Sequence, residues 1–344
     1  MAPWQASVDR FCHQYLQLEA EPDLPPAEYL KLHDVQEAIY NGAFADSVRH
    51  APPRRYQLRL LKALVAAIER SIDDWEQHAL SEDLMSALAL LLATPLPSEV
   101  DSAQQKCYVT YALSLLPPSA SAASPPPTIT LLENRSLISA GGTTGLRTWE
   151  AALHLGQYLC TRPALVRERR VLELGAGTGY LSILCARHLQ ATHVIASDGS
   201  DDVLHNLTES LFLNGMQGAN ASSRRIAPMD LKWGHALVGT EEAQWNGGRD
   251  VDVVLGADIT YDRSVIPALV ATLLELFALY PSVEVYLAAT QRNHATFSVF
   301  LEACQGNRLA VQDLQYGVTP RGKQTGPFYS DAVEIRACKI SRIV

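Results

Sequence analysis

The sequence predicts an α/β fold preceded by an α-helical N-terminal region. From residue 170 onward, stretches typical of strands alternate with stretches typical of helices, which indicates βαβ units and a mostly parallel sheet with helices on both faces. The expected strands are 170–174, 193–197, 224–228, 251–257, 283–289, 308–315 and 332–340, and the expected helices are 179–189, 201–213, 264–279 and 294–305. No helical pattern separates the last two strands, so we expect them to form an antiparallel edge hairpin.

Residues 1–115 are expected to form a separate α-helical domain. Apolar residues recur at helical spacing from Tyr56 to Ala79, and Ser81 is expected to cap a second helix that runs to Leu92. Earlier helical stretches lie near 5–20 and 27–42. This region carries no recognisable chemistry, so we expect a scaffold or a partner-binding surface.

A stretch rich in Pro, Ser and Ala at 116–127 predicts a linker, and residues 128–344 are expected to form the second domain. At its start, 128–132 and 136–139 flank a short polar turn and resemble the two strands of a hairpin. A helix is expected to follow from Thr143 to Cys160.

The composition is that of a globular protein with an ordinary core. Of 344 residues, 47% are hydrophobic and 19% are charged, which leaves enough apolar side chains for two domains. A net charge of -9 disfavours direct nucleic-acid binding, which needs Lys and Arg to neutralise phosphates. The six cysteines show no C-x-x-C spacing, so we expect reduced thiols and no metal site. The chain has no pattern typical of a signal peptide or a membrane span, so we expect a cytoplasmic monomer without membrane contact.

Residues 171–179 read VLELGAGTG, and this stretch is the most informative in the chain. An apolar strand leads into three glycines and then a helix, a context in which free backbone N–H groups face a ligand. The spacing is G-x-G-x-G, whereas dinucleotide-binding turns have G-x-G-x-x-G. Glu173 precedes the glycines and would repel a pyrophosphate, so a ligand with an ammonium or sulfonium group fits better. S-adenosylmethionine carries both, although a β–α turn without function remains the alternative.

Acidic and aromatic residues follow three of the expected strands, at the edge where open α/β sheets bind ligands. Asp198 can accept hydrogen bonds from ribose hydroxyls, or it caps the next helix. Trp233 can stack on an adenine, or it packs on the surface. Asp258 and Tyr261 can hold an amine acceptor, or they cap and cover the helix that follows. For each residue both interpretations stay open at this point.

Taken together, E-x-G-x-G-x-G at 173–179 and D-x-x-Y at 258–261 resemble motifs of the seven-β-strand S-adenosylmethionine-dependent protein-lysine methyltransferases. Residues 139–152 resemble the G-T-T-G-L-x-T-W-x-A-A segment of the eukaryotic elongation factor 2 lysine methyltransferases, and 290–293 is similar to a T-x-R-N segment of that family. The resemblance covers 128 to the end, and it extends to 1–115 only in helical character. It implies a Rossmann-like seven-stranded methyltransferase sheet.

The resemblance also implies roles for single residues. Trp149 would border the methionine part of S-adenosylmethionine, Asp198 would hold its ribose, and Trp233 its adenine. Asp258 and Tyr261 would line the lysine channel as the catalytic pair, with Asp258 also at the cofactor. The cofactor cradle would consist of Glu173, Gly175, Gly177 and Gly179. The implied activity is methyl transfer from S-adenosylmethionine to a lysine of elongation factor 2, with no metal.

One segment departs from the family pattern, and three other functions stay open. A long polar stretch at 316–329 replaces a tight turn, and we expect either a substrate lid or a flexible hairpin there. The chain could instead methylate another protein lysine or a small molecule. It could also be a catalytically inactive binding protein that uses its helical domain. The glycine spacing disfavours an NAD-dependent dehydrogenase.

Overall fold

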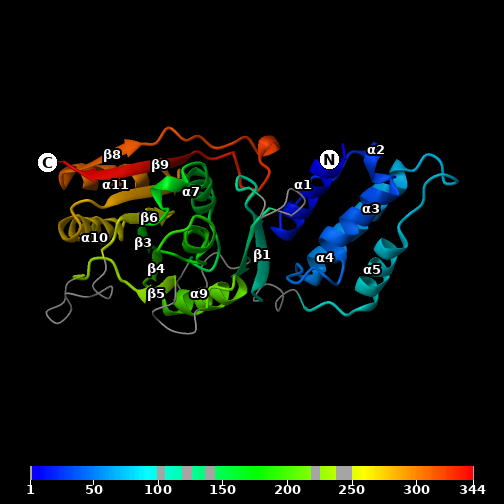
Figure 1. Cartoon of the computed structure of the whole chain (residues 1–344), viewed down its shortest axis with the longest axis horizontal. Helices are drawn as coiled ribbons and strands as arrows, with labels where there is room; N and C mark the ends of the chain where they lie inside the picture. Colours follow the sequence, from blue (N-terminus) through cyan, green and yellow to red (C-terminus); the bar gives the residue numbers. More distant parts are fainter. Residues whose placement is uncertain are drawn as a thin grey trace. The chain divides into compact units, whose positions relative to one another are not determined.

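The computed structural model describes residues 2–98, 105–117, 126–135, 144–217, 225–237 and 250–343. By its internal contacts the chain forms two compact units (Figure 1). Unit 1 comprises Met1–Leu137 and Thr325–Phe328, and unit 2 comprises Ile138–Gln324 and Tyr329–Val344. The expected division into 1–115, 116–127 and 128–344 stays a prediction.

The first part of unit 1 is helical. Its helices are α1 (Gln5–Leu16), α2 (Ala27–Leu30), α3 (His33–Ile39), the π-helical turn η1 (Tyr40–Phe44), α4 (Arg54–Ser71) and α5 (Glu82–Ala93). Their apolar faces meet in one core around the fully buried side chains of Phe11, Tyr15 and Leu61. The Ser81 side chain accepts a hydrogen bond from the Leu84 N–H, so the expected cap of α5 is present.

Unit 1 ends in a two-stranded antiparallel hairpin that the sequence pattern did not predict. Strand β1 (Cys107–Ala112) pairs with β2 (Thr128–Glu133), with Val109 opposite Leu131. The prediction of helix throughout 1–115 is therefore wrong at β1, where β-branched and aromatic residues favour a strand. The partner expected for β2 was 136–139, which lies outside the described residues.

The segment 325–328 belongs to unit 1 although it comes late in the chain. Gln17 binds it through its side-chain amide, which donates to the Phe328 carbonyl and accepts from the Phe328 N–H. The Phe328 ring is 1% exposed, and the Arg10 guanidinium lies over it. Beside it in unit 2, the Gln324 side chain makes the same paired contact with the Tyr329 backbone. In the 316–329 stretch, side-chain amides thus bind the backbone groups of Phe328 and Tyr329, and a substrate lid or flexible hairpin stays a prediction.

Unit 2 contains a seven-stranded sheet in the order β5-β4-β3-β6-β7-β9-β8, so the expected fold class is confirmed. Five neighbouring strands are parallel, β9 is antiparallel to β7, and β8 closes the edge antiparallel to β9 as expected. The strands are β3 (Arg170–Leu174), β4 (His193–Asp198), β5 (Ile226–Asp230), β6 (Val253–Ala257), β7 (Glu284–Thr290), β8 (Leu309–Asp313) and β9 (Ile335–Arg342). Leu174 lies opposite Ser197 in β4 and Gly256 in β6, so these three strands end level.

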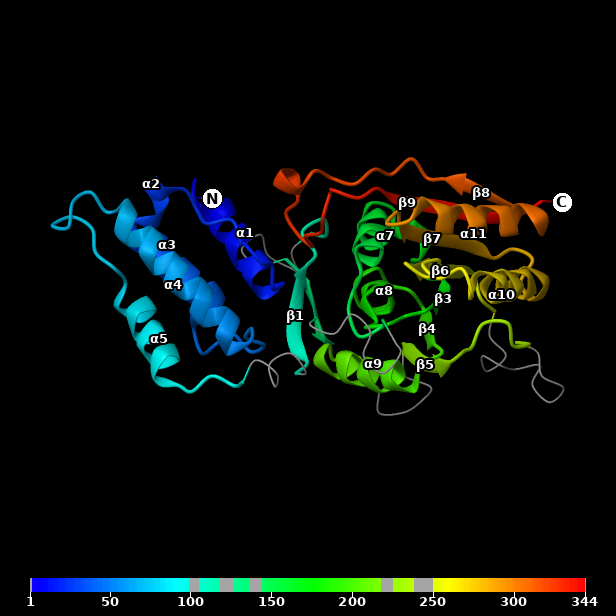
Figure 2. The same cartoon turned by 180° about the vertical axis from the view of Figure 1, so that it is seen from behind.

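Helices cover both faces of this sheet (Figures 1 and 2). The first three lie on one face and the last two on the other: α7 (Glu150–Thr161), α8 (Tyr180–Ile183) with the π-helical turn η3 (Leu184–His188), and α9 (Asp201–Leu213), then α10 (Ile266–Leu279) and α11 (His294–Gly306). Short 3₁₀ turns are η2 (Pro163–Leu165) and η5 (Arg321–Lys323). Helix α7 begins at Glu150, later than the expected Thr143. Trp149 before it has an extended backbone, and residues 144–149 form a loop that lines the site described below.

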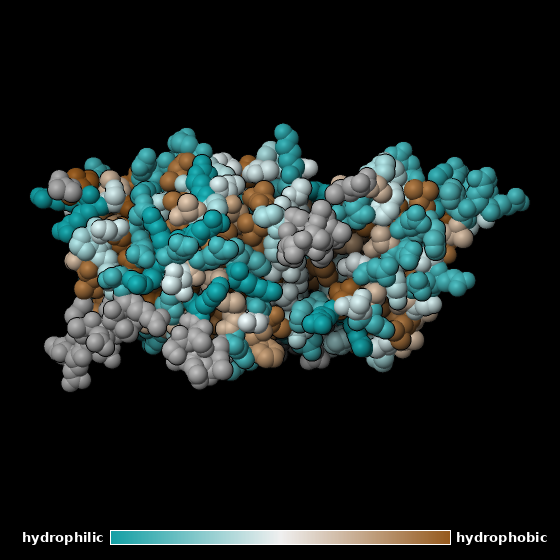
Figure 3. Space-filling view, in the orientation of Figure 1, coloured by the Kyte–Doolittle hydropathy of each residue, from teal (hydrophilic) through white to brown (hydrophobic). Residues whose placement is uncertain are grey.

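On the face shown in Figure 3, hydrophilic residues predominate and apolar ones are scattered among them. Helix α5 is the main exception in unit 1, since Met85, Leu90 and Leu92 are exposed. Over the described ranges, no helix combines the length and the apolar character needed to cross a bilayer.

Candidate active site

A cavity of about 530 Å³ opens at the carboxyl ends of β3, β4 and β6. This volume lies within the usual range for a small-molecule site, and its position is the one at which open α/β sheets bind ligands. Eight of the predicted site residues line it: Trp149, Glu173, Gly175, Gly177, Asp198, Trp233, Asp258 and Tyr261. The structure thus brings together residues that are more than 100 positions apart in the chain.

The glycine turn after β3 is shaped so that side chains would not fit. Gly175, Gly177 and Gly179 all have positive φ, a region that L-residues with a side chain rarely adopt. A Cβ at Gly177 would lie 3.1 Å from the Gly145 carbonyl oxygen, and one at Gly175 would lie 2.7 Å from Ile259. Gly179 differs from the other two, because it does not line the cavity and a Cβ there would clash with Leu207. Its direct contact with a cofactor stays a prediction.

The segment before α7 lies against this turn. The Thr148 and Thr178 hydroxyls are 2.7 Å apart and buried, and the Trp149 indole N–H donates to the Thr144 carbonyl at 3.0 Å. With the close approach of Gly145 to Gly177, these contacts hold the 144–149 segment over the glycine turn. Trp149 is therefore placed at the cavity by a folded loop, and the part of the family segment at 139–143 lies outside the described residues.

Glu173 is the last but one residue of β3 and is only 3% exposed. The Ser182 hydroxyl donates a hydrogen bond to its carboxylate. Burial raises the pKa of Glu173 from 4.5 to about 8, against the opposite effect of the Ser182 hydrogen bonds. At neutral pH the group therefore holds a proton, and a cation brought into the cavity would favour its release.

Asp198 and Trp233 lie on the β4 and β5 side of the cavity. The Asp198 carboxylate accepts from the Gly177 N–H and the Ser200 N–H, each at 3.1 Å. The carboxylate thus links the glycine turn to the start of α9. Each of its oxygens keeps a further lone pair that can accept from a ligand hydroxyl. Burial raises the pKa of Asp198, while these backbone hydrogen bonds lower it. The Trp233 ring lies 3.5 Å from where a Gly175 Cβ would be, which makes it a wall of the cavity.

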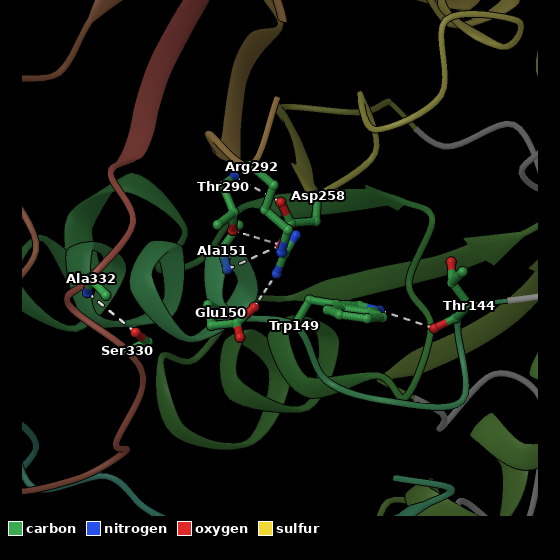
Figure 4. Close-up of polar contacts among 9 residues, drawn as sticks. All are labelled: Thr144, Trp149, Glu150, Ala151, Asp258, Thr290, Arg292, Ser330 and Ala332. Atoms are coloured by element: carbon green, nitrogen blue, oxygen red, sulfur yellow. Dashed lines mark hydrogen bonds and ion pairs between the residues drawn. The ribbon is translucent and has the colours of Figure 1, made fainter. Parts of the chain in front are cut away.

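Asp258 lies at the end of β6 in a left-handed conformation with φ of 51°, which a non-glycine residue adopts only at an energetic cost. Its carboxylate accepts from the Thr290 N–H at 2.8 Å, the Thr290 hydroxyl at 2.9 Å and the Ala151 N–H at 3.4 Å (Figure 4). One side chain thus connects the ends of β6 and β7 to the first turn of α7. Burial raises the pKa of Asp258, and the Thr290 and Arg292 contacts lower it.

Arg292 completes this cluster. It forms ion pairs with Glu150 and, at 3.6 Å, with Asp258, and its guanidinium lies 4.9 Å from the Trp149 ring centroid (Figure 4). In the sequence, 290–293 shows only a family resemblance, and no pattern indicates a role for Arg292 or Glu150. No local pattern identifies this ion pair, because its members are 142 positions apart.

A second, smaller cavity of about 70 Å³ adjoins the first and shares Asp258 and Tyr261 with it. Its other lining residues include Thr260, Gln291 and Asn293. Tyr261 is 60% exposed, so its ring stands at the border of both cavities and is open to solvent. A group entering the small cavity would meet a ligand of the large one beside Asp258.

The large cavity fits S-adenosylmethionine in its chemistry. It offers a side-chain-free turn for close backbone approach, a carboxylate for ribose hydroxyls, an aromatic wall for adenine, and buried acids for cationic groups. Within the described ranges, no group of three or more His, Cys, Asp or Glu side chains could hold a metal ion.

Comparison with known proteins gives one family. A lysine methyltransferase family model matches residues 133–307. Protein-lysine N-methyltransferase EFM3 of Chaetomium thermophilum is 56% identical over 97% of both chains. Human protein-lysine N-methyltransferase EEF2KMT is 30% identical over 84% of this chain and 80% of its own. Saccharomyces cerevisiae EFM3 is 32% identical over 54% of this chain and 55% of its own.

Proposed function

The chain belongs to the lysine methyltransferase family, and from this premise we propose that it methylates a lysine of eukaryotic elongation factor 2. Membership makes the chain an S-adenosylmethionine-dependent protein-lysine N-methyltransferase, and the acceptor protein is the proposed part. The observation that carries the choice is the 139–152 segment, which resembles the corresponding segment of the elongation factor 2 enzymes. The relationship to a human enzyme named EEF2KMT supports it. A cytoplasmic location is part of the same proposal.

The cofactor, when bound, supplies a sulfonium-linked methyl group that an amine takes up as the sulfur–carbon bond breaks. The protein's task is to orient donor and acceptor in line and to exclude water. In our proposal Asp198 accepts the ribose hydroxyls, Trp233 covers the adenine, and the turn at Gly175 and Gly177 lets the backbone approach the ligand.

The acceptor side is proposed to be the small cavity beside Asp258 and Tyr261. A lysine amine has an ordinary pKa of about 10.4, so it must lose a proton before it can attack. An aromatic ring at the border can hold the ammonium by a cation–π contact until the proton leaves to solvent. Both Asp258 oxygens already accept protein hydrogen bonds, so we propose that Asp258 mainly fixes the geometry of the site around the amine.

Mass spectrometry of unmethylated elongation factor 2, after incubation with the purified chain and S-adenosylmethionine, tests this proposal. We expect a mass increase of whole methyl groups on one lysine, and none with the Asp258→Ala variant. The same incubation with elongation factor 1A serves as the specificity control. Methylation of another protein with none on elongation factor 2 would contradict the acceptor and leave the enzyme class intact.

A further inference from the structure

Arg147 is a cavity residue to which neither the motifs nor the family resemblance gives a role. It lies in the 144–149 segment between Gly145, which approaches Gly177, and Thr148, which contacts Thr178. Its side chain lines the large cavity, and its guanidinium carbon is 5.0 Å from the Trp149 ring centroid. In the family segment that 139–152 resembles, position 147 is one of two variable positions.

The two cations that line the large cavity differ in whether an acidic side chain lies beside them. Its acids are Glu173, Asp198 and Asp258, and its cations are Arg147 and Lys232. Lys232 has an acidic neighbour, because its Nζ lies 3.6 Å from an Asp230 carboxylate oxygen. Arg292, which lines only the small cavity, is paired with Glu150 and Asp258.

Among the described residues, the Arg147 guanidinium makes no hydrogen bond or ion pair, and its Nε is buried without a hydrogen-bond partner. A guanidinium that is partly removed from water and lacks an anion is unfavourable, unless a ligand supplies the anion. In the described ranges, Arg147 is thus the cation lining the large cavity that has no acidic partner.

We propose that Arg147 binds the carboxylate of the methionine half of the cofactor. This carboxylate is the only anionic group of S-adenosylmethionine, and a guanidinium binds carboxylates through paired hydrogen bonds. The arginine lies on the segment that covers the glycine turn, beside Trp149, which the family resemblance places at the methionine part. An acidic residue of the protein substrate is the weaker choice, because Arg147 does not line the small cavity.

Two ligands that differ only in this carboxylate test the proposal by isothermal titration calorimetry. S-adenosylmethionine and its decarboxylated form are titrated into the wild type and into Arg147→Met, which keeps an unbranched side chain and removes the charge. The wild type should bind the carboxylated ligand about tenfold or more tightly, the size expected for a hydrogen-bonded charge pair. In the variant this preference should fall to about twofold or less, because only the carboxylated ligand loses a partner.

Lys232→Met is the matched control, since it removes the other cavity-lining cation and should leave the preference unchanged. Arg147→Lys should keep part of it, and melting curves by circular dichroism establish that each variant is folded. A preference that survives in Arg147→Met, or equal weakening of both ligands, would overturn the proposal. The experiment contains no acceptor protein, so its outcome is independent of whether elongation factor 2 is the substrate.

Discussion

Asp198 and Asp258 lie at the carboxyl ends of β4 and β6, the two neighbours of β3, yet their surroundings differ. Asp198 is the last residue of β4 and Asp258 directly follows β6. Both line the cavity, and burial raises the pKa of each. The hydrogen bonds that the structure gives the Asp198 carboxylate come from backbone N–H groups of adjoining turns, among them Gly177 and Ser200. Asp258 accepts from Thr290 and Ala151 and pairs with Arg292, so it connects three separate elements.

From this difference we propose that the two aspartates have separate tasks. The local bonds of Asp198 orient its carboxylate and leave lone pairs for a ligand, which is suited to binding. The distant bonds of Asp258 set the relation of β6, β7 and α7, which is suited to holding the reaction geometry. The following predictions test this contrast, beginning with the largest expected effect.

Asp258→Ala should lower methyl transfer by about 100-fold or more, because misplacement of reacting groups by about 1 Å can cost that much. It should also lower the free energy of unfolding by about 2–3 kcal/mol, since the Thr290 and Ala151 donors lose a buried charged acceptor. Single-turnover transfer and urea unfolding measure the two effects. Asp262→Ala, an exposed neighbour in the same loop, is the control. If Asp258→Ala were as stable as the wild type, Asp258 would not connect β6, β7 and α7 as we infer.

Asp198→Ala should lower the affinity for S-adenosylhomocysteine by about 10-fold to 100-fold, since hydrogen bonds to a charged group are lost. Its transfer rate at saturating cofactor should stay near that of the wild type. Calorimetry reads the affinity, and Asp202→Ala, exposed in the first turn of α9, controls for the loss of negative charge. An unchanged affinity would contradict the inference that Asp198, unlike Asp258, serves mainly to bind the cofactor.

Arg292→Met should lower methyl transfer by about 10-fold, a smaller effect than loss of Asp258, because Arg292 is 43% exposed and its ion pairs are partly screened. The affinity for S-adenosylhomocysteine should change little, since Arg292 does not line the large cavity. The exposed Arg263→Met variant is the control. An affinity loss as large as that of Asp198→Ala would place Arg292 with the ligand-binding group.

The last prediction concerns Glu173→Gln, which should change how the stability of the folded protein depends on pH. Burial raises the pKa of Glu173 from 4.5 in the unfolded chain to about 8, so the folded form binds the extra proton between these values. The stability that this proton contributes is complete below pH 4.5 and is lost as the pH rises through about 8.

The Tm of Glu173→Gln relative to the wild type should therefore rise by a few degrees, about 3–6 °C, between pH 5 and pH 9. Thermal melting without ligand measures the shift, and the exposed Glu209→Gln variant should show none of it. A constant difference across this range would mean that Glu173 titrates at an ordinary pKa.

The order of strands and helices in unit 2 follows from the sequence because its signals are local. Period-two and helical spacing, with the glycine turn at 175–179, place β3 to α11 within a few residues of their observed bounds. The grouping of Asp198 and Asp258 at one edge follows from the parallel arrangement of their strands. The fold and the positions of most cavity residues could therefore be predicted from the sequence.

Contacts between positions that are far apart in the chain could not be predicted from the sequence. The Arg292–Glu150 ion pair and the Gln17–Phe328 contact join residues 142 and 311 positions apart, and no periodic pattern marks either. Likewise, β1 finds its partner β2 across the 116–127 stretch, so strand pairing here depends on tertiary packing. The proposed role of Arg147 could be inferred only after the structure showed which charged side chains lie near it.

The most direct test of this account is methyl transfer to elongation factor 2 by Asp198→Ala and Asp258→Ala, measured by mass spectrometry at rising S-adenosylmethionine concentration. If Asp198 binds the cofactor and Asp258 holds the reaction geometry, excess cofactor should restore transfer in the first variant and leave the second inactive. Restoration of both variants, or of neither, would contradict the account.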